Sequence, residues 1–234
     1  MKTSKIISIA LLAFAFVACH KPCNTPQFVC YYYNSSVSLP ASDDMPEMAV
    51  QIYRDIECPL PSNEAWTKIH DYIVSEVVKD SITPDMEILY EYPAVVLKDT
   101  ESTYTYQHND YISLRTYHLD DSIYGYYCHT KWYDLGAHGT EGYYYRYFDT
   151  RTGEPISIEN LASDLSAVSA YLDATIRQSD KAWGILVDTI QPNNNFIISD
   201  SGLTFVYNQY EIACFAADTI MCFVPYNIIK PCAE

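Results

Sequence analysis

The sequence predicts an α+β fold, mainly an antiparallel sheet with two amphipathic helices packed on one face. Apolar residues recur at helical spacing in two segments, 62–79 and 158–178. Short runs rich in Tyr and Val, with polarity that alternates every second residue, fill much of the chain from residue 87 onward. Because these runs follow one another with short turns between them, we expect neighbouring strands to pair antiparallel.

The two predicted helices each present one apolar stripe. The first begins at Ser62, which can cap the helix, and ends near Lys79, whose charge suits the negative end of the helix dipole. The stripes contain Ala65, Trp66, Ile69, Tyr72, Ile73, Val77 and Val78 in the first helix, and Leu161, Leu165, Val168, Leu172 and Ile176 in the second. Both stripes indicate a face that packs on the core, and neither implies a cofactor.

The candidate strands are separated by Asp, Asn, Gly and Pro, the residues typical of turns. They are residues 30–38, 48–56, 87–97, 102–108, 111–118, 123–133, 142–149, 184–190, 196–198, 203–208, 212–216 and 220–224.

Residues 1–18 have the pattern of a bacterial signal peptide, with Lys2 and Lys5 before an apolar segment too short to span a bilayer. The segment ends in Ala18-Cys19, which resembles a lipobox, where a peptidase cuts before the Cys and the Cys carries lipid. We therefore expect Cys19 to be lipidated and to anchor the protein on the periplasmic or outer surface of the cell envelope. The alternative is an ordinary secretory signal in which Cys19 is incidental.

After the signal peptide, the sequence suggests three consecutive segments. We expect a tether and a first strand in 19–45, an N-terminal α+β subdomain in 46–109 and a C-terminal α+β domain in 110–234. No later apolar run reaches the length of a membrane span.

The chain is acidic, with a formal net charge of −16. This charge repels nucleic acid and anionic lipid head groups, so we expect no nucleic-acid partner. It would attract a basic protein such as a lysozyme. The alternative role of the charge is solubility in the envelope.

Besides Cys19 the chain has seven cysteines, and an exported protein can form disulfides. Cys214 and Cys222 lie four residues either side of Asp218, so a tight turn there would bring them opposite each other on two strands. We predict this pair as a disulfide candidate. The Cys and His spacings match no metal site, and we expect neither a metal nor a cofactor.

A glycine-rich loop at 134–142 contains His138, the first candidate for contact with a ligand. Asp134 and Glu141 lie close to it in sequence. The alternative is a structural turn whose imidazole bonds the backbone, and the lack of a second His at ligand spacing favours it. The sequence contains no nucleophile elbow and no marked carboxylate pair, so we assign no catalytic residue.

Aromatic residues are concentrated on the strands that flank this loop. Strand alternation places Tyr143, Tyr145 and Tyr147 on one face, and Trp132 lies on the preceding strand. If exposed, these rings would contact sugar or a partner protein, and together with His138 they are our candidate ligand-binding residues. The alternative is that tyrosine serves here as a good strand former.

Several short motifs occur in a characteristic order. They are Gly-Ala-His-Gly139, Tyr147-Phe-Asp-Thr-Arg-Thr-Gly153, Ile156-Ser-Ile-Glu-Asn-Leu161, Ser199-Asp-Ser-Gly-Leu-Thr-Phe-Val-Tyr207, Tyr210-Glu-Ile-Ala213 and Val224-Pro-Tyr226. Over about residues 110–230 this series resembles the extracytoplasmic domain pair of unknown function shared by RsiV-type anti-sigma factors and PdaC-type peptidoglycan deacetylases.

The resemblance implies an α+β envelope domain, which senses or binds lysozyme in some relatives and accompanies cell-wall modification in others. The chain shows neither a sigma-binding segment with a spanning helix nor a deacetylase motif, so neither activity is carried over. Relatives tend to have Pro-Tyr-Ala-Ala-Gly where this chain has Cys214-Phe-Ala-Ala-Asp218. The Cys in place of the Pro supports the predicted disulfide.

Our main hypothesis is an envelope lipoprotein with a non-enzymatic binding or sensing domain, for lysozyme or peptidoglycan. One alternative is a peptidoglycan-modifying enzyme that uses His138 and a nearby carboxylate. A second alternative is a structural or assembly lipoprotein.

Overall fold

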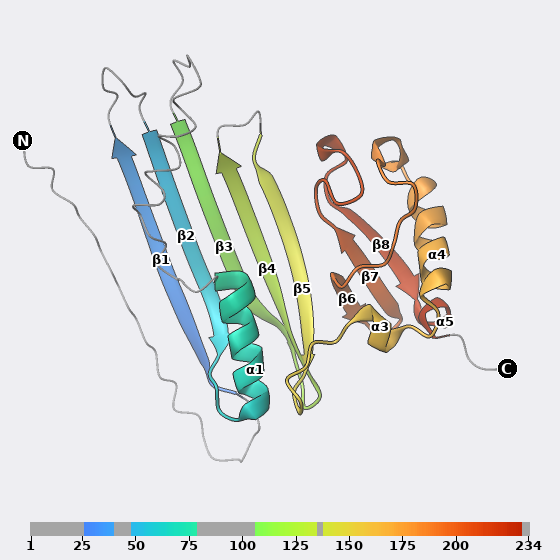
Figure 1. Cartoon of the computed structure of the whole chain (residues 1–234), viewed down its shortest axis with the longest axis horizontal. Helices are drawn as coiled ribbons and strands as arrows, with labels where there is room; N and C mark the ends of the chain where they lie inside the picture. Colours follow the sequence, from blue (N-terminus) through green and yellow to red (C-terminus); the bar gives the residue numbers. More distant parts are fainter. Residues whose placement is uncertain (1–25, 40–47, 79–105, 135–137, 231–234) are drawn as a thin grey trace, which may run out of the picture. The chain divides into compact units, whose positions relative to one another are not determined.

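The structure is a computed structural model that describes residues 26–39, 48–78, 106–134 and 138–230. Its strands form two sheets, one of order β1-β2-β3-β4-β5 and one of order β6-β7-β8, accompanied by short helices (Figure 1). The predicted α+β class with mainly antiparallel strands is therefore confirmed. The signal peptide, Cys19 and the candidate strand 87–97 lie outside the described residues.

The chain divides into two compact units. The first contains Met1–Leu114 and Thr130–Thr140, and the second contains Arg115–His129 and Glu141–Glu234. The units are discontinuous in sequence because the long strands β3 and β4 contribute residues to both.

The five-stranded sheet combines antiparallel and parallel pairing. Its strands are β1 (Phe28–Leu39), β2 (Met48–Pro59), β3 (Tyr106–Leu119), β4 (Ile123–Asp134) and β5 (Thr140–Asp149). β1 pairs antiparallel with β2, whereas β2 pairs parallel with β3. Since parallel neighbours need a long crossover, the segment between β2 and β3 contains a helix, α1 (Glu64–Ile73).

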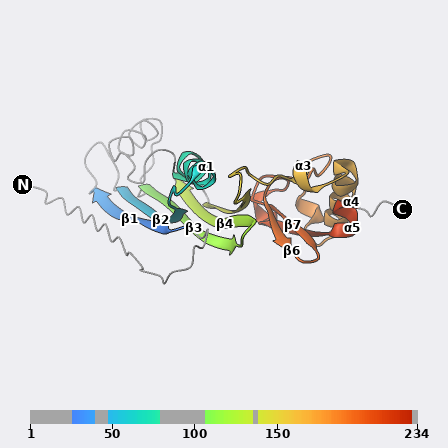
Figure 2. The same cartoon turned by 90° about the horizontal axis from the view of Figure 1, so that it is seen from below.

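In the first unit, α1 covers one face of β2 (Figure 2). The buried residues of the helix are Ala65, Trp66, Ile69 and Ile73, all members of the predicted apolar stripe. Asn63 caps the helix, because its side-chain oxygen accepts the N–H of Trp66 at 3.0 Å. The predicted cap, Ser62, is wrong by one residue. The α-helix ends at Ile73 and continues as one π-helical turn (Val74–Val78).

The second unit contains the three-stranded sheet and its helices. Its elements are α3 (Ile158–Leu161), α4 (Leu165–Arg177), a 3-10 turn η2 (Ala182–Gly184), β6 (Phe196–Ser199), β7 (Gly202–Tyr207), a 3-10 turn η3 (Phe215–Ala217), β8 (Ile220–Pro225) and α5 (Tyr226–Ile229). α4 and α5 lie beside β8 (Figure 1). Their buried faces join alternate residues of β7 and β8 in one hydrophobic core.

The predicted helix 158–178 is interrupted in the structure. Asp164 caps a new helix there, since its carboxylate accepts the N–H groups of Ser166 and Ala167 at 2.8 and 3.1 Å. Just before it, the N–H of Ser163 donates to the carbonyl of Ile229 at 3.0 Å. The apolar spacing continues across the break, which is why periodicity alone did not reveal it.

Two predicted strands, 184–190 and 212–216, are wrong. They meet in a single isolated bridge, Ile185 to Ala213. After Ala213 the chain turns into η3. Before it, Tyr210 has a left-handed φ of 67°. Together these turns leave too few extended residues for a ladder.

Gly202 opens β7 at a point where the chain of β8 is very close. A Cβ atom at this position would lie 2.2 Å from the carbonyl oxygen of Val224. Only glycine fits that approach, so the Ser-Gly motif at 201–202 has a structural role.

Candidate binding surface

An aromatic ladder crosses three strands of the second unit. It consists of Tyr117 on β3, Tyr127 and His129 on β4, and Tyr143 and Tyr145 on β5. Strand alternation puts the two β4 rings on one side of their strand, and likewise the two β5 rings. Ring contacts join all five residues into one group.

The rings of the aromatic ladder contact one another in stacked, tilted and edge-on geometries. The centroids of His129 and Tyr143 are 4.9 Å apart with planes within 3°, and those of Tyr127 and Tyr145 are 5.0 Å apart. Tyr117 meets Tyr145 edge-on at 5.2 Å and keeps 50% of its surface exposed. The His129–Tyr143 stack covers one face of each of these two rings, whereas Tyr117 stays open to a ligand.

A carboxylate lies at one end of the aromatic ladder. The Nε2 atom of His129 is 2.5 Å from Oε1 of Glu141. Burial, together with the hydrogen bond and charge of Glu141, raises the pKa of Tyr143 to about 12. The Tyr143 phenol is therefore protonated at neutral pH, and it stands beside the side chains of His129 and Glu141.

Side-chain amides bond the β5 backbone in the way a neighbouring strand would. Gln209 accepts the N–H of Glu141 at 3.1 Å, Asn208 that of Tyr143 at 2.8 Å and Asn195 that of Tyr145 at 2.8 Å. The amide groups of Asn195 and Asn208 also donate to the carbonyl of Tyr143, at 2.8 and 3.2 Å. These bonds satisfy the strand edge, so contact with a ligand falls to the side chains of the aromatic ladder.

Asp218 adds a second carboxylate near Tyr143. Its Oδ1 accepts the amide of Gln209 at 3.4 Å and the N–H of Thr219 at 2.7 Å, and its charge contributes to the raised pKa of Tyr143. The residue has φ 60° and ψ −168°, a conformation that glycine favours.

Of the predicted ligand-binding residues, Trp132 and His138 belong to the first unit. Trp132 is 47% exposed on β4. His138 is also exposed, and its Nδ1 lies 3.3 Å from the carbonyl oxygen of Gly139. That contact fits the structural turn proposed as the alternative for this loop.

The prediction that Tyr147 faces a ligand is wrong, whereas Tyr143 and Tyr145 are half-buried and remain accessible. Tyr147 is only 2% exposed. Its ring stacks on Phe196 at 5.9 Å, and its hydroxyl oxygen accepts the N–H of Ile198 at 3.1 Å. β6 thus covers this end of β5, and burial raises the pKa of Tyr147 to about 12.

Cys214 and Cys222 are not joined in the structure, and both are free thiols. The expected hairpin between them is replaced by η3. Cys214 lies next to Gly184, whereas Cys222 is buried on β8 opposite Phe205.

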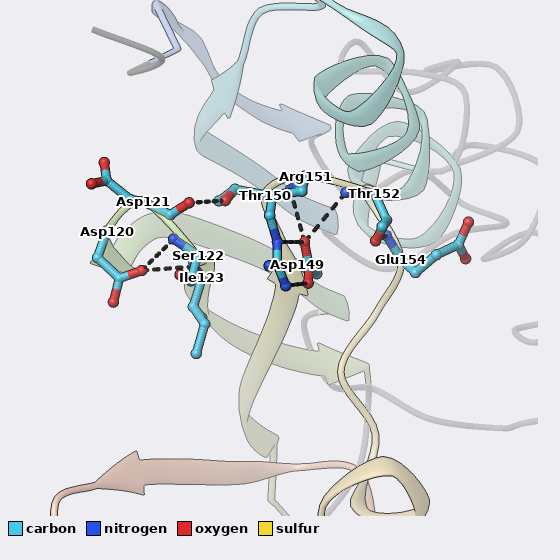
Figure 3. A network of polar contacts seen from close by, with 9 residues as sticks. All are labelled: Asp120, Asp121, Ser122, Ile123, Asp149, Thr150, Arg151, Thr152 and Glu154. Atoms are coloured by element: carbon cyan, nitrogen blue, oxygen red, sulfur yellow. Dashed lines mark hydrogen bonds and ion pairs between the residues drawn. The ribbon is translucent and has the colours of Figure 1, made fainter.

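The motif at 149–153 forms a polar corner (Figure 3). Asp149 accepts the N–H groups of Arg151 and Thr152 at 2.8 and 3.3 Å and pairs with the Arg151 guanidinium at 2.5 Å. Thr150 bonds the carbonyls of Ser122 and Asp121 at 3.0 and 2.8 Å. The motif therefore joins the β3–β4 turn to the end of β5.

Glu211, the carboxylate of the Tyr-Glu-Ile-Ala motif, closes a turn. Its Oε2 accepts the N–H of Asn208 at 2.5 Å, and its own N–H donates to the carbonyl of Asn208 at 3.1 Å. Burial raises the pKa of this carboxyl. These bonds give Glu211 a structural role.

Within the described ranges, no group of three or more His, Cys, Asp or Glu side chains could hold a metal ion. Nor does any helix in those ranges combine the length and hydropathy that crossing a bilayer requires.

Sequence reasoning named Glu141 as a carboxylate near His138, but it missed His129 and the asparagines that bond β5. The two rings on β4 and the two on β5 do follow an alternating pattern that could have indicated them. The amide–backbone bonds join residues more than 45 positions apart, between β5 and the segment 195–209, so no local signal pointed to them.

The fold and this surface define an α+β protein whose second unit carries a partly exposed aromatic ladder with carboxylates at one end. Residues 155–227 match the family model described as "Protein of unknown function (DUF3298)", so the chain contains a DUF3298 domain.

Solved structures support the fold. A DUF3298 family member from Bacteroides fragilis is similar with a TM-score of 0.67 and 18% identity, covering 88% of this chain and 92% of that one. A DUF3298 family protein from Pseudomonas aeruginosa is similar with a TM-score of 0.50 and 16% identity, covering 88% and 95%. At these identities the likeness concerns the fold alone. Comparison with curated proteins finds no match.

Proposed function

We propose that this protein is a lipid-anchored lipoprotein of the cell envelope whose C-terminal domain binds a partner without catalysing a reaction. The partner is a basic protein such as a lysozyme, or peptidoglycan. The signal-like residues 1–18 followed by Cys19 support the anchor. The resemblance to the RsiV and PdaC extracytoplasmic domains supports the choice of partners.

The observation that carries the proposal is the aromatic ladder. Tyr117 is half exposed, and the four other rings are half-buried in fixed mutual contact. Rigid aromatic side chains make large contacts at low entropic cost, which is why Tyr is enriched in binding surfaces.

The charge at this surface favours a basic protein over a neutral glycan. Glu141 and Asp218 stand at the Tyr143 end of the aromatic ladder. Stacking on sugar needs an open ring face, and one face of Tyr143 is already covered by His129. Carboxylates and phenol oxygens instead accept hydrogen bonds from Lys and Arg.

The enzymatic alternative would rest on His129 and Glu141. Their contact of 2.5 Å is the kind of pair that can move a proton. The groups stacked beside it are tyrosines, which offer no activated nucleophile, and therefore we place this alternative second.

A retention assay tests the proposal. Residues 20–234, which keep every element of the described fold, are immobilised and exposed to lysozyme or to insoluble peptidoglycan at low and high salt. We expect lysozyme to be retained at low salt and released at high salt. Failure to retain either material at low salt would contradict the proposal and leave a structural or assembly role.

Matched variants locate the contact. Tyr117→Ala should weaken retention by about tenfold, because it removes the most open ring of the aromatic ladder. Tyr32→Ala is the control, since this tyrosine of the first unit is exposed to a similar degree, 53% against 50%. Release of soluble fragments or acetate from peptidoglycan, lost in His129→Gln, would instead support the enzymatic alternative.

A further inference from the structure

The second unit exposes further apolar side chains that do not belong to the aromatic ladder. Trp183 and Leu186 are 67% and 70% exposed, and Tyr210 is 55% exposed. The ring of Tyr210 lies 5.9 Å from that of Phe215, which is half-buried. We call these four residues the end patch.

The residues of the end patch come from two distant segments that run side by side. Leu186 donates its N–H to the carbonyl of Ile212 at 2.9 Å, and the carbonyl of Gly184 accepts the N–H of Cys214 at 2.8 Å. η2, which contains Trp183, contacts η3, which contains Phe215. The bridge between Ile185 and Ala213 lies between these bonds and sets an antiparallel register.

The backbone beneath the end patch is tightly packed. A Cβ atom on Gly184 would lie 2.7 Å from the Cβ of Ala217, so only glycine lets the two 3-10 turns approach this closely. Tyr210 is held in its left-handed conformation by the turn that Asn208 and Glu211 close. Apolar side chains on a firm backbone lose little freedom on binding.

The charges around the end patch are mostly negative. The two segments that build it, 178–188 and 208–219, contain the exposed carboxylates Asp180, Asp188 and Asp218, besides Glu211 in its turn, against the single cation Lys181. The Lys181 ammonium already donates to the carbonyl of Thr219 at 2.8 Å. Nearby Arg177 bonds both Asp173 and the carbonyls of Val187 and Asp188.

The carboxylates around the end patch, its acidic rim, favour some ligands over others. A second copy of the chain would bring acidic rim against acidic rim, and anionic lipid would be repelled in the same way. A neutral apolar segment would gain nothing from the carboxylates. A segment with an apolar row flanked by Lys or Arg satisfies both the rings and the carboxylates.

We propose that the end patch is a docking surface for an amphipathic cationic segment of a partner protein. Its apolar residues and its variants differ from those of the aromatic ladder, although Asp218 stands near both surfaces. The ligand seats its apolar side chains on Trp183, Leu186 and Tyr210 and directs its cations to the surrounding carboxylates.

The test uses a short amphipathic helical peptide of Leu and Lys as the probe, titrated into residues 20–234. Affinity is measured by calorimetry for the wild type, for Trp183→Ser and for Leu186→Ser. We expect binding that weakens with salt and that either substitution reduces by about tenfold. The matched control is Phe223→Ser, an exposed aromatic on β8, which should leave the affinity within about twofold.

Other outcomes overturn the proposal. Equal binding of a Leu and Gln peptide would show that charge plays no part, and equal binding by Trp183→Ser would exclude the end patch. Binding to anionic vesicles, or self-association abolished by Trp183→Ser, would identify a membrane or a second copy as the occupant. Tyr117→Ala serves as the reference for the aromatic ladder. If the peptide affinity is unchanged in Tyr117→Ala but lost in Trp183→Ser, the peptide binds the end patch and not the aromatic ladder. This conclusion holds even if lysozyme is not retained.

Discussion

The side-chain amide of Asn208 bonds the backbone of Tyr143 twice, accepting its N–H at 2.8 Å and donating to its carbonyl at 3.2 Å. Asn195 repeats the pattern one step along β5, with the N–H of Tyr145 and the same carbonyl. The edge of β5 is thereby closed by side chains from just before β6 and just after β7. The positions of the β5 rings in the aromatic ladder depend on these amides.

Replacing Asn195 should destabilise the second unit. Asn195→Ala leaves the N–H of Tyr145 without its acceptor in a site where Asn195 is only 4% exposed. The expected loss is about 2–3 kcal/mol in the free energy of unfolding. Urea unfolding of residues 20–234 measures it, with the exposed Asn227→Ala of α5 as the control at about 0.5 kcal/mol or less. Equal losses in the two variants would contradict the role of the amide.

Asp218→Gly should stabilise the protein. The residue has φ 60° and ψ −168°, a region where a non-glycine residue costs about 1–3 kcal/mol. Loss of the bond to the N–H of Thr219 offsets part of the gain, so we expect about 1 kcal/mol in thermal or urea unfolding.

Asp200→Gly provides the comparison for this substitution. Asp200 lies in the β6–β7 turn and is not among the described non-glycine residues with positive φ. Glycine there only increases the freedom of the unfolded chain, so stability should fall. A loss of stability in both variants would argue against strain at Asp218.

Cys214 and Cys222 should react at different rates. Burial raises the pKa of the Cys222 thiol, so little thiolate is available there, whereas Cys214 is half-buried next to η3. Under native conditions we expect iodoacetamide to label Cys214 first, as peptide mass spectrometry would show. A peptide pair linked through Cys214 and Cys222 in unreduced protein would instead support the disulfide predicted from the sequence.

The corner at Asp149 should contribute to stability against acid. The bonds from Arg151 hold the pKa of Asp149 at about 2, below its ordinary value of 3.8. Because the folded pKa is the lower one, the stabilisation is complete above the ordinary value and is lost as the pH falls towards about 2.

Asp149→Asn should therefore reduce the change in urea midpoint between pH values near 4 and near 2. Asp200→Asn, at an exposed turn, should retain the pH dependence of the wild type. If the change in urea midpoint between these pH values is the same in Asp149→Asn as in the wild type, other carboxylates dominate the acid response. One candidate is Asp120, whose pKa is also lowered.

Periodicity predicted the helices and most strands because it reflects local geometry. The stripe of Trp66 and Ile69 and the alternation of Leu203 and Phe205 are visible in any short window, and all four residues are buried. The same rule failed at 184–190 and 212–216, where single turns interrupt extended chain. The turn at Gly184 packs against Ala217, and no short window contains both residues.

The candidate surface was predictable in part. Strand alternation alone places Tyr143 and Tyr145 on one side of β5, and both remain accessible, whereas their contact with a ligand stays a prediction. Tyr147 shares that side but is covered by Phe196 and Ile198, which come from a segment nearly 50 residues away. No local pattern indicates the pairing of His129, because its partner, Glu141, lies on the next strand beyond a loop.

Local chemistry was therefore enough to establish the α+β class, the stripes that pack on the core and the acidic character of the chain. These properties follow from residue spacing and composition, which do not depend on distant contacts. Long-range packing decided which tyrosines stay accessible, that Asn195 and Asn208 close the edge of β5, and that the exposed Trp183 and Leu186 meet Tyr210 and Phe215 in the end patch. Burial at each of these sites is set by segments far apart in the chain, and their meeting depends on the whole fold.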